Sequence, residues 1–159
     1  MPKKIIIISD NHGMEKPIQD ILNAYPEADY FFHLGDSEMP YQFLKGYARV
    51  RGNNDYDFDY PENLILEIDD HKFYLTHGHR DYVAFGLDTL IHKMRQEGCD
   101  IGCFGHTHRY FEAKADGLLL LNPGSIWHNR DGSKPSYMIL TLGDKITVER
   151  KVYPIEKID

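Results

Sequence analysis

The first half of the chain alternates short apolar runs with polar loops and one clear helical pattern. Residues 5–8 form a continuous β-branched run, which is typical of a strand buried on both faces. Over residues 17–26, which begin and end with proline, apolar residues recur with the spacing of one helix face. Residues 30–34 and 47–50 repeat the strand pattern, and residues 40–45 suit a short helix. This alternation predicts parallel strands that lie side by side and are joined by right-handed crossovers.

The second half is dominated by strand patterns. Residues 64–68 and 72–76 predict a hairpin, and a helical pattern over 86–98 ends at Gly98, a residue suited to cap a helix. The apolar run 101–104 predicts a short buried strand. We expect a run of hairpins in the remainder, from strands over residues 110–113, 118–121, 136–142 and 145–153. This order predicts an α/β fold, α+β in some schemes, in which two mixed β-sheets pack into a sandwich flanked by helices.

Composition and charge narrow the classes of function. At 159 residues, with 42% apolar and 27% charged residues, the chain suits a single globular domain over residues 1–159. The net charge of −7 and the lack of a long basic run argue against binding to extended nucleic acid, but they allow a small phosphorylated substrate. No stretch approaches the roughly 18–20 apolar residues of a membrane helix. Cys99 and Cys103 are expected to be reduced core residues, as in a cytoplasmic protein. The oligomeric state stays open, with a homodimer among the alternatives.

Residues with metal-binding side chains stand where the predicted strands end. Five such ends carry Asp10 and His12, Asp36, Asn53, His77, and His106 with His108. Taken alone, Asp10 could cap the following loop and Asn53 could be a turn residue. Together these residues offer two carboxylates, four imidazoles and one amide, enough for two divalent ions that share a bridging carboxylate. A two-metal site of this kind can bind phosphoryl oxygens and hold a bridging hydroxide as the nucleophile.

Five short motifs, taken in chain order, resemble the signature of a known family. The motifs are Asp10-x-His12, Gly35-Asp36, Gly52-Asn53, His77-Gly78-His79 and Gly105-His106-Thr107-His108. In this order they resemble the signature of the calcineurin-like metallophosphoesterases. The short chain and the later Asn122-Pro123-Gly124-Ser125 are similar to the small bacterial and archaeal phosphodiesterase branch of that family, which includes the retromer subunit of the same fold. The resemblance covers residues 5–142 and implies the four-layer architecture of the family.

The resemblance also implies a ligand set for each of two divalent ions. One metal would take Asp10, His12, Asp36 and His108. The other would take Asp36, Asn53, His77 and His106, with Asp36 as the bridge. Manganese is the metal that the resemblance favours, while mixed nitrogen and oxygen ligands also admit Fe, Zn²⁺ or Ni²⁺.

The chain departs from the family pattern at Asn54, where many members carry a histidine that stabilises the transition state or protonates the leaving group. Asn54 can donate a hydrogen bond to the substrate but cannot deliver a proton near neutral pH. We therefore expect a preference for good leaving groups or a substitute acid, for which His79 is the nearest candidate. Arg51 and Arg109 flank ligand positions and are candidate contacts of the substrate phosphate, with surface solvation as the alternative.

The resulting hypothesis is a cytoplasmic two-metal phosphoesterase that hydrolyses a small phosphodiester by attack of a metal-bridging hydroxide on phosphorus. One alternative is a binding or scaffold protein that keeps the fold and is weak or inactive in catalysis. Another is a single structural zinc held by His77, His106 and His108.

Four residues near these motifs have no place in the signature. His33 and His71 are expected to be structural, because the first lies in a predicted buried strand and the second in a hairpin turn. Trp127 and His128 either line the mouth of the site or pack under it. The natural substrate stays open, because specificity would depend on the loops around that mouth.

Overall fold

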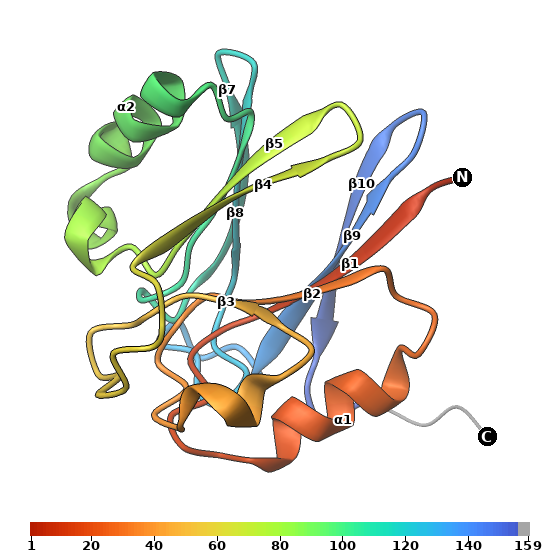
Figure 1. Cartoon of the computed structure of the whole chain (residues 1–159), viewed down its shortest axis with the longest axis vertical. Helices are drawn as coiled ribbons and strands as arrows, with labels where there is room; N and C mark the ends of the chain where they lie inside the picture. Colours follow the sequence, from red (N-terminus) through yellow and green to blue (C-terminus); the bar gives the residue numbers. More distant parts are fainter. Residues whose placement is uncertain (156–159) are drawn as a thin grey trace.

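The structure, a computed structural model, describes residues 1–155 as two five-stranded β-sheets with two α-helices (Figure 1). The strands are β1 Lys3–Ile8, β2 Tyr30–His33, β3 Ala48–Arg49, β4 Asn63–Ile68, β5 His71–Thr76, β6 Ile101–Cys103, β7 Tyr110–Ala115, β8 Leu118–Pro123, β9 Ser136–Leu142 and β10 Ile146–Val152. The α-helices are α1 Lys16–Ala24 and α2 Asp88–Glu97, and the 3-10 helices are η1 Tyr41–Leu44, η2 His79–Asp81 and η3 Val83–Phe85. Residues 156–159, the end of the predicted domain, lie outside the described residues. Within the described part, no helix is long and apolar enough to cross a membrane.

Both sheets are mixed, as predicted. The first has the order β10-β9-β1-β2-β3, in which β1, β2 and β3 are parallel and β9 is antiparallel to both of its neighbours. The second has the order β4-β5-β6-β8-β7, in which β5, β6 and β8 are parallel and β4 and β7 are antiparallel edge strands. The parallel strands of each sheet therefore end at a common edge, where side chains from distant parts of the sequence can meet.

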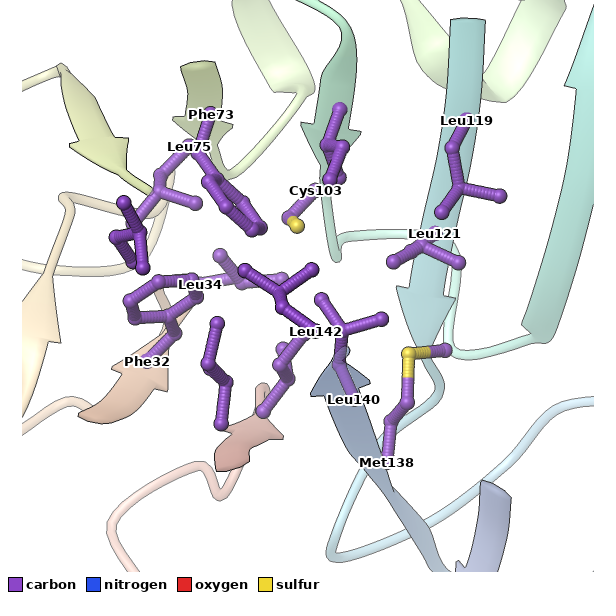
Figure 2. Packing of buried hydrophobic residues seen from close by; sticks show 14 of the residues in the cluster. Phe32, Leu34, Phe73, Leu75, Cys103, Leu119, Leu121, Met138, Leu140 and Leu142 are labelled. Carbon is purple, nitrogen blue, oxygen red and sulfur yellow. The ribbon is translucent and has the colours of Figure 1, made fainter. Parts of the chain in front are cut away.

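The two faces of β1 explain why its apolar run is continuous. Ile5 and Ile7 point into the core between the sheets, while Ile6 and Ile8 pack with Ile18 of α1 on the outer face. Figure 2 shows the inter-sheet core, where side chains of β2, β5, β6, β8 and β9 interdigitate. On the far side, α2 buries its apolar face against the second sheet. The layers are thus α1, first sheet, second sheet and α2, the predicted four-layer sandwich (Figure 1).

The prediction of successive hairpins in the last third is wrong at one junction. The strands β7 and β8 form a hairpin in the second sheet, and β9 and β10 form one in the first, so residues 124–135 cross between the sheets. The reason is that β8 is buried along its whole length and pairs on its other side with β6, in parallel, which leaves no edge for β9. The crossing segment passes the end of β1, since the Ile126 N–H donates to the Ser9 carbonyl at 3.1 Å.

Local sequence patterns predicted most of the other helices and strands close to their observed positions. Gly98 adopts a left-handed backbone (φ 71°) after α2, as expected for a helix cap. The helix begins later than predicted, at Asp88, and the short helix near residue 41 is of the 3-10 type. Cys99 and Cys103 are both free and buried, as predicted.

Candidate metal centre

Four loops that follow parallel strands meet at one edge of the sandwich. The loops after β1 and β2 are joined by backbone hydrogen bonds, from Asp10 N–H to the Gly35 carbonyl and from His12 N–H to the Asp36 carbonyl, both 3.0 Å. In the second sheet, the Gly105 N–H donates to the His77 carbonyl, also at 3.0 Å, and so joins the loops after β5 and β6. The predicted strand ends are therefore held together by main-chain contacts, independently of any ion.

Sharp backbone turns bring the side chains of these loops inward. Nine non-glycine residues of the described part have a positive φ, and six of them belong to this site: Asp10, His12, Asp36, Glu38, His106 and His108. Such conformations cost free energy and persist where the surrounding structure enforces them, which is common at functional sites. Gly35 (φ 102°) and Gly52 allow the close approach, because a Cβ on either would collide with His77 or Asp36 respectively.

The Asp10 carboxylate lies at the middle of the site with one oxygen unpaired. Its Oδ2 accepts hydrogen bonds from the Ser9 hydroxyl and the His106 N–H. Its Oδ1 is buried and has no hydrogen-bond partner among the described residues. Three imidazole nitrogens surround this Oδ1: Nε2 of His108 at 3.4 Å, of His12 at 3.7 Å and of His77 at 3.8 Å. A buried carboxylate oxygen is costly unless something positively charged faces it, so the arrangement fits a cation.

The hydrogen bonds of the other ring nitrogens determine what these three Nε2 atoms present. The Nδ1 atoms of His77 and His108 lie 2.7 and 2.8 Å from the carbonyls of Leu34 and His128, and they must donate because a carbonyl only accepts. The Nδ1 of His12 lies 2.9 Å from a carboxylate oxygen of Glu38 and donates to it for the same reason. In neutral imidazoles the Nε2 atoms then carry lone pairs, and these lone pairs converge on the centre.

The convergent lone pairs face further acceptors. Nε2 of His12 and Nε2 of His108 lie 2.9 Å apart. Nε2 of His77 lies 3.0 Å from the Asn53 Oδ1 and 3.3 Å from the Asp36 Oδ2. Acceptor atoms at such distances repel one another unless a proton or a metal ion lies among them. The donor set, of nitrogen and oxygen only, is one that divalent transition metals accept.

Two overlapping groups of ligand atoms result. Asp10, His12 and His108 form one, and Asp10, Asp36 and His77 form the other, with the ligand atoms of each group within 4.8 Å of one another. Asp10 belongs to both groups, while the Asp36 Oδ2 also faces both sides, at 3.3 Å from Nε2 of His77 and 4.0 Å from Nε2 of His12. The ring of the predicted ligand His106 lies at the rim, with its centroid 5.1 Å from that of His77.

Charge at the centre also favours a cation. Burial alone would raise the pKa of Asp10, but the charge of His77, the nearby His108 ring and the hydrogen bond from Ser9 hold it below the ordinary value. The pKa of Asp36 is likewise lowered, against its burial, by contacts with His77 and Asn54. Burial would lower the pKa of His77, yet the charges of Asp10 and Asp36 raise it to about 9. Without metal, a proton on His77 therefore partly balances the two carboxylates.

The chain matches the calcineurin-like phosphoesterase superfamily domain over residues 4–145. It belongs to that superfamily. YsnB, a probable metallophosphoesterase of Bacillus subtilis (strain 168), is 38% identical over 148 residues, which cover 91% of this chain and 88% of that protein. A conserved uncharacterized protein of Streptococcus pneumoniae TIGR4, a predicted phosphoesterase, has a TM-score of 0.90 at 30% identity, over 97% of this chain and 94% of its own. Vps29 from Cryptosporidium parvum shares the fold, with a TM-score of 0.71 at 23% identity over 94% and 97% of the two chains.

These similarities confirm the family and the small prokaryotic phosphoesterase branch that the motifs indicated. They also confirm the fold class, including its occurrence in Vps29. By homology, this superfamily member is a probable metal-dependent phosphoesterase with Asp and His clusters suited to bind metal.

The other predicted site residues of this superfamily member surround the centre in different ways. Asn54 is exposed and holds Asp36, since its N–H and Nδ2 donate to the two carboxylate oxygens at 2.8 and 2.9 Å. His79 begins η2, and its ring centroid lies 5.4 Å from that of His77. Arg51 donates to the Asp55 carbonyl at 3.1 Å and its guanidinium lies 4.4 Å from the ring centre of Phe58.

Arg109 differs from Arg51, because its guanidinium has no ion pair or hydrogen bond to a described residue. It is exposed and lines a groove on the outer side of its loop, with Thr107 and Phe111. Arg109 therefore makes fewer side-chain contacts than Arg51 and is more available to bind a ligand.

Glu38 and Asp55 have a role in the site although no motif in the sequence pointed to them, whereas Ser125 belongs to the motif Asn122-Pro123-Gly124-Ser125. Glu38 holds His12, and the buried Asp55 accepts N–H groups of Asp36, Glu38 and Gly52 at 2.7–2.9 Å. Ser125 donates its hydroxyl to the Asp10 carbonyl at 2.8 Å. Only the proximity of Asp55 to Asn53 and of Glu38 to Asp36 in the sequence could have suggested these two acidic residues.

His33 is structural, as expected, but it supports the centre directly. The Gly35 N–H donates to its Nδ1 at 3.1 Å, so its Nε2–H donates to the Asn11 Oδ1 at 2.7 Å. Burial lowers the pKa of His33 to about 3, which keeps the ring neutral. This neutral histidine ties the loop after β1 to the loop after β2. His71 lies in the β4–β5 hairpin, where its Nδ1 contacts Asp100 at 2.6 Å.

Proposed function

We propose that this protein is a dinuclear metal-dependent phosphoesterase that hydrolyses small phosphodiesters. One observation carries the proposal: the buried, unpaired Oδ1 of Asp10 is surrounded by Nε2 atoms of His12, His77 and His108, whose lone pairs point inward. A centre built in this way needs positive charge. The chain is a member of a phosphoesterase superfamily. In such a protein, positive charge at the ends of the strands would bind an anionic phosphate ester.

The proposed ligand sets are those implied by the motifs. Asp10, His12, Asp36 and His108 would hold one ion, and Asp36, Asn53, His77 and His106 the other, with Mn²⁺ favoured over Fe, Zn²⁺ or Ni²⁺. When bound, two such ions lower the pKa of water and neutralise charge on the phosphoryl oxygens. The location of Asp36, whose Oδ2 faces both histidine groups, supports its role as the shared ligand.

The chain itself orients the ligands and the substrate. The Leu34 and His128 carbonyls and the Glu38 carboxylate fix the ring orientation of His77, His108 and His12. The Asn54 Nδ2 donates to the Asp36 Oδ2 at 2.9 Å, and its second N–H would donate a hydrogen bond to a phosphoryl oxygen. Because an amide cannot deliver a proton to a leaving group, the reaction favours esters whose leaving group departs as a stable anion.

Two other side chains complete the proposed site. His79, beside His77, is the candidate proton donor. Arg109, whose guanidinium makes no hydrogen bond or ion pair with a described residue, is a better candidate for the substrate phosphate than Arg51, which contacts Asp55 and Phe58. We also propose a small ester as the substrate, a cytoplasmic location and no binding of extended nucleic acid. The charge of −7 and the two free cysteines support these proposals.

The test is hydrolysis of a chromogenic aryl phosphodiester, bis(p-nitrophenyl) phosphate, beside the monoester p-nitrophenyl phosphate, with Mn²⁺ supplied to chelator-treated protein. We expect turnover of the diester above that of the monoester, and a loss of about 100-fold in Asp36→Asn. Asp144→Asn, an exposed carboxylate far from the strand edge, is the matched control and should retain activity. If folded, metal-loaded protein hydrolyses neither ester, the enzyme assignment fails and the scaffold alternative, suggested by the fold shared with Vps29, is favoured.

A single structural zinc is the remaining alternative. His77 and His106 have their ring centroids 5.1 Å apart, whereas His108 lies with the His12 group. Metal analysis separates the two: one tightly held zinc per chain that survives Asp36→Ala would favour the single site.

A further inference from the structure

One aromatic side chain stands at the mouth of the metal centre. Trp127 is the only tryptophan of the chain, and 46% of its surface is exposed. Its ring centre lies 5.3 Å from that of His12 and 6.4 Å from that of His108, with the rings tilted by 58° and 85°. The indole therefore lies beside the imidazoles of His12 and His108, and the rest of its surface is exposed to solvent.

The backbone of Trp127 is fixed relative to the centre. Its N–H donates to the Ser125 Oγ at 3.0 Å, and that same hydroxyl donates to the Asp10 carbonyl at 2.8 Å. On the other side, the carbonyl of His128 accepts the Nδ1–H of His108. The backbone of Trp127 is thus held between two ligand loops by hydrogen bonds. Its side chain is also less exposed than those of Phe58 and Phe85, which are 83% and 90% exposed.

We propose that Trp127 determines substrate specificity by stacking on a planar ring of the substituent that stays on phosphorus when the leaving group departs, so that the preferred substrates are phosphodiesters in which this substituent carries an aryl ring or a nucleobase. This inference rests on the proposed phosphoesterase function of the same site. A half-exposed indole offers a large flat apolar surface that a planar ring covers well, and stacking of this kind favours aromatic over saturated rings of the same size. A ring joined directly to the ester lies close to phosphorus. Trp127, which lies beside two of the proposed metal ligands, would be near enough to stack on such a ring.

The kinetic test uses p-nitrophenyl diesters that share one leaving group and differ in the second substituent: phenyl, thymidine-5′-yl, cyclohexyl or methyl. In Trp127→Ala we expect KM to rise about tenfold for the phenyl and thymidine esters, and by a clearly smaller factor for the cyclohexyl and methyl esters. Trp127→Phe should restore most of the preference. A thymidine ester affected more than the phenyl ester would identify a nucleobase as the preferred ring, and the reverse would identify an aryl group. Phe43→Ala, another exposed aromatic, is the matched control.

A binding measurement tests the same inference without turnover. Phenylphosphonate and cyclohexylphosphonate carry rings of similar size on a bond that resists hydrolysis. In Mn²⁺-loaded wild type, phenylphosphonate should bind about tenfold more tightly and change the emission of Trp127. Calorimetric titration of Trp127→Ala with Mn²⁺ checks that the His12 group still binds metal.

The outcomes separate the stacking role of Trp127 from the proposed phosphoesterase function. An equal rise in KM for all four esters in Trp127→Ala, or no rise for any, overturns the stacking role while leaving the phosphoesterase assignment intact. Failure of wild type to hydrolyse any of the four esters overturns the proposed function instead.

Discussion

His77 should make the stability of the metal-free protein depend on pH. Its Nδ1 donates to the Leu34 carbonyl, so a second proton on Nε2 faces the Asp36 Oδ2 at 3.3 Å and the Asn53 Oδ1 at 3.0 Å. Although burial opposes it, the charges of Asp10 and Asp36 raise the pKa of His77 from 6.5 to about 9. A folded-state pKa above the unfolded value means that the stabilisation is complete below pH 6.5 and is lost as the pH rises to about 9.

The size of the effect follows from the shift in pKa. At about 1.4 kcal/mol per pKa unit, the rise from 6.5 to about 9 corresponds to about 3 kcal/mol of unfolding free energy. Bound metal needs the same lone pair, so ion binding displaces the proton and its affinity should rise with pH. Metal-loaded protein is therefore expected to lose much less stability over this range than metal-free protein.

Urea unfolding of chelator-treated protein at pH 6.5 and pH 9 measures the effect directly. Wild type should lose about 3 kcal/mol between the two pH values, and His77→Gln should lose much less. His92→Gln, an exposed histidine of α2, is the matched control and should behave as wild type. A flat pH profile in metal-free wild type, or an unchanged pH dependence in His77→Gln, would show that His77 does not gain a proton on folding.

Three further substitutions test other parts of the site. Glu38→Gln should weaken the affinity for Mn²⁺ about tenfold in calorimetric titration, because Glu38 orients His12. Glu67→Gln on β4 is the control and should not weaken it, and equal affinities in the two variants would contradict the role of Glu38. Gly52→Ala should lower the unfolding free energy by about 1–3 kcal/mol in urea, because its Cβ would collide with Asp36. Gly143→Ala, whose Cβ would make only ordinary van der Waals contacts, should lose much less, and equal losses would count against the role of packing at Gly52. Asn54→His should supply a proton donor and therefore raise the rate of hydrolysis of phenyl esters about tenfold more than that of p-nitrophenyl esters. Asn63→His should not, and an equal change in the rates of both ester classes in Asn54→His would exclude the role as proton donor.

Much of the fold and the centre could be predicted because their signals are local. The β-branched run of β1 and the polar residues that follow β1, β2, β5 and β6 are contiguous in sequence, and parallel strands bring such ends to one edge. Gly35 and Gly52 mark the close approach of the loops. The meeting of Asp10, His12, Asp36 and His77 thus follows from strand order.

The rest depends on contacts that local patterns do not contain. The crossing from β8 to β9 depends on β8 pairing with β6, and no turn sequence reveals it. Glu38 and Ser125 act on His12 and Asp10 through side chains brought near by left-handed backbone and by the crossing segment. Trp127 could be placed at the mouth of the centre only once that segment was traced.

We propose that this centre is active only when two ions are bound together. The most direct measurement is a titration of chelator-treated protein with Mn²⁺ in which bound metal and hydrolysis of bis(p-nitrophenyl) phosphate are followed at each step. We predict little activity up to one bound ion per chain and full activity only as the second ion binds. Full activity with a single ion per chain, or no hydrolysis with two ions bound, would contradict the proposed two-ion centre.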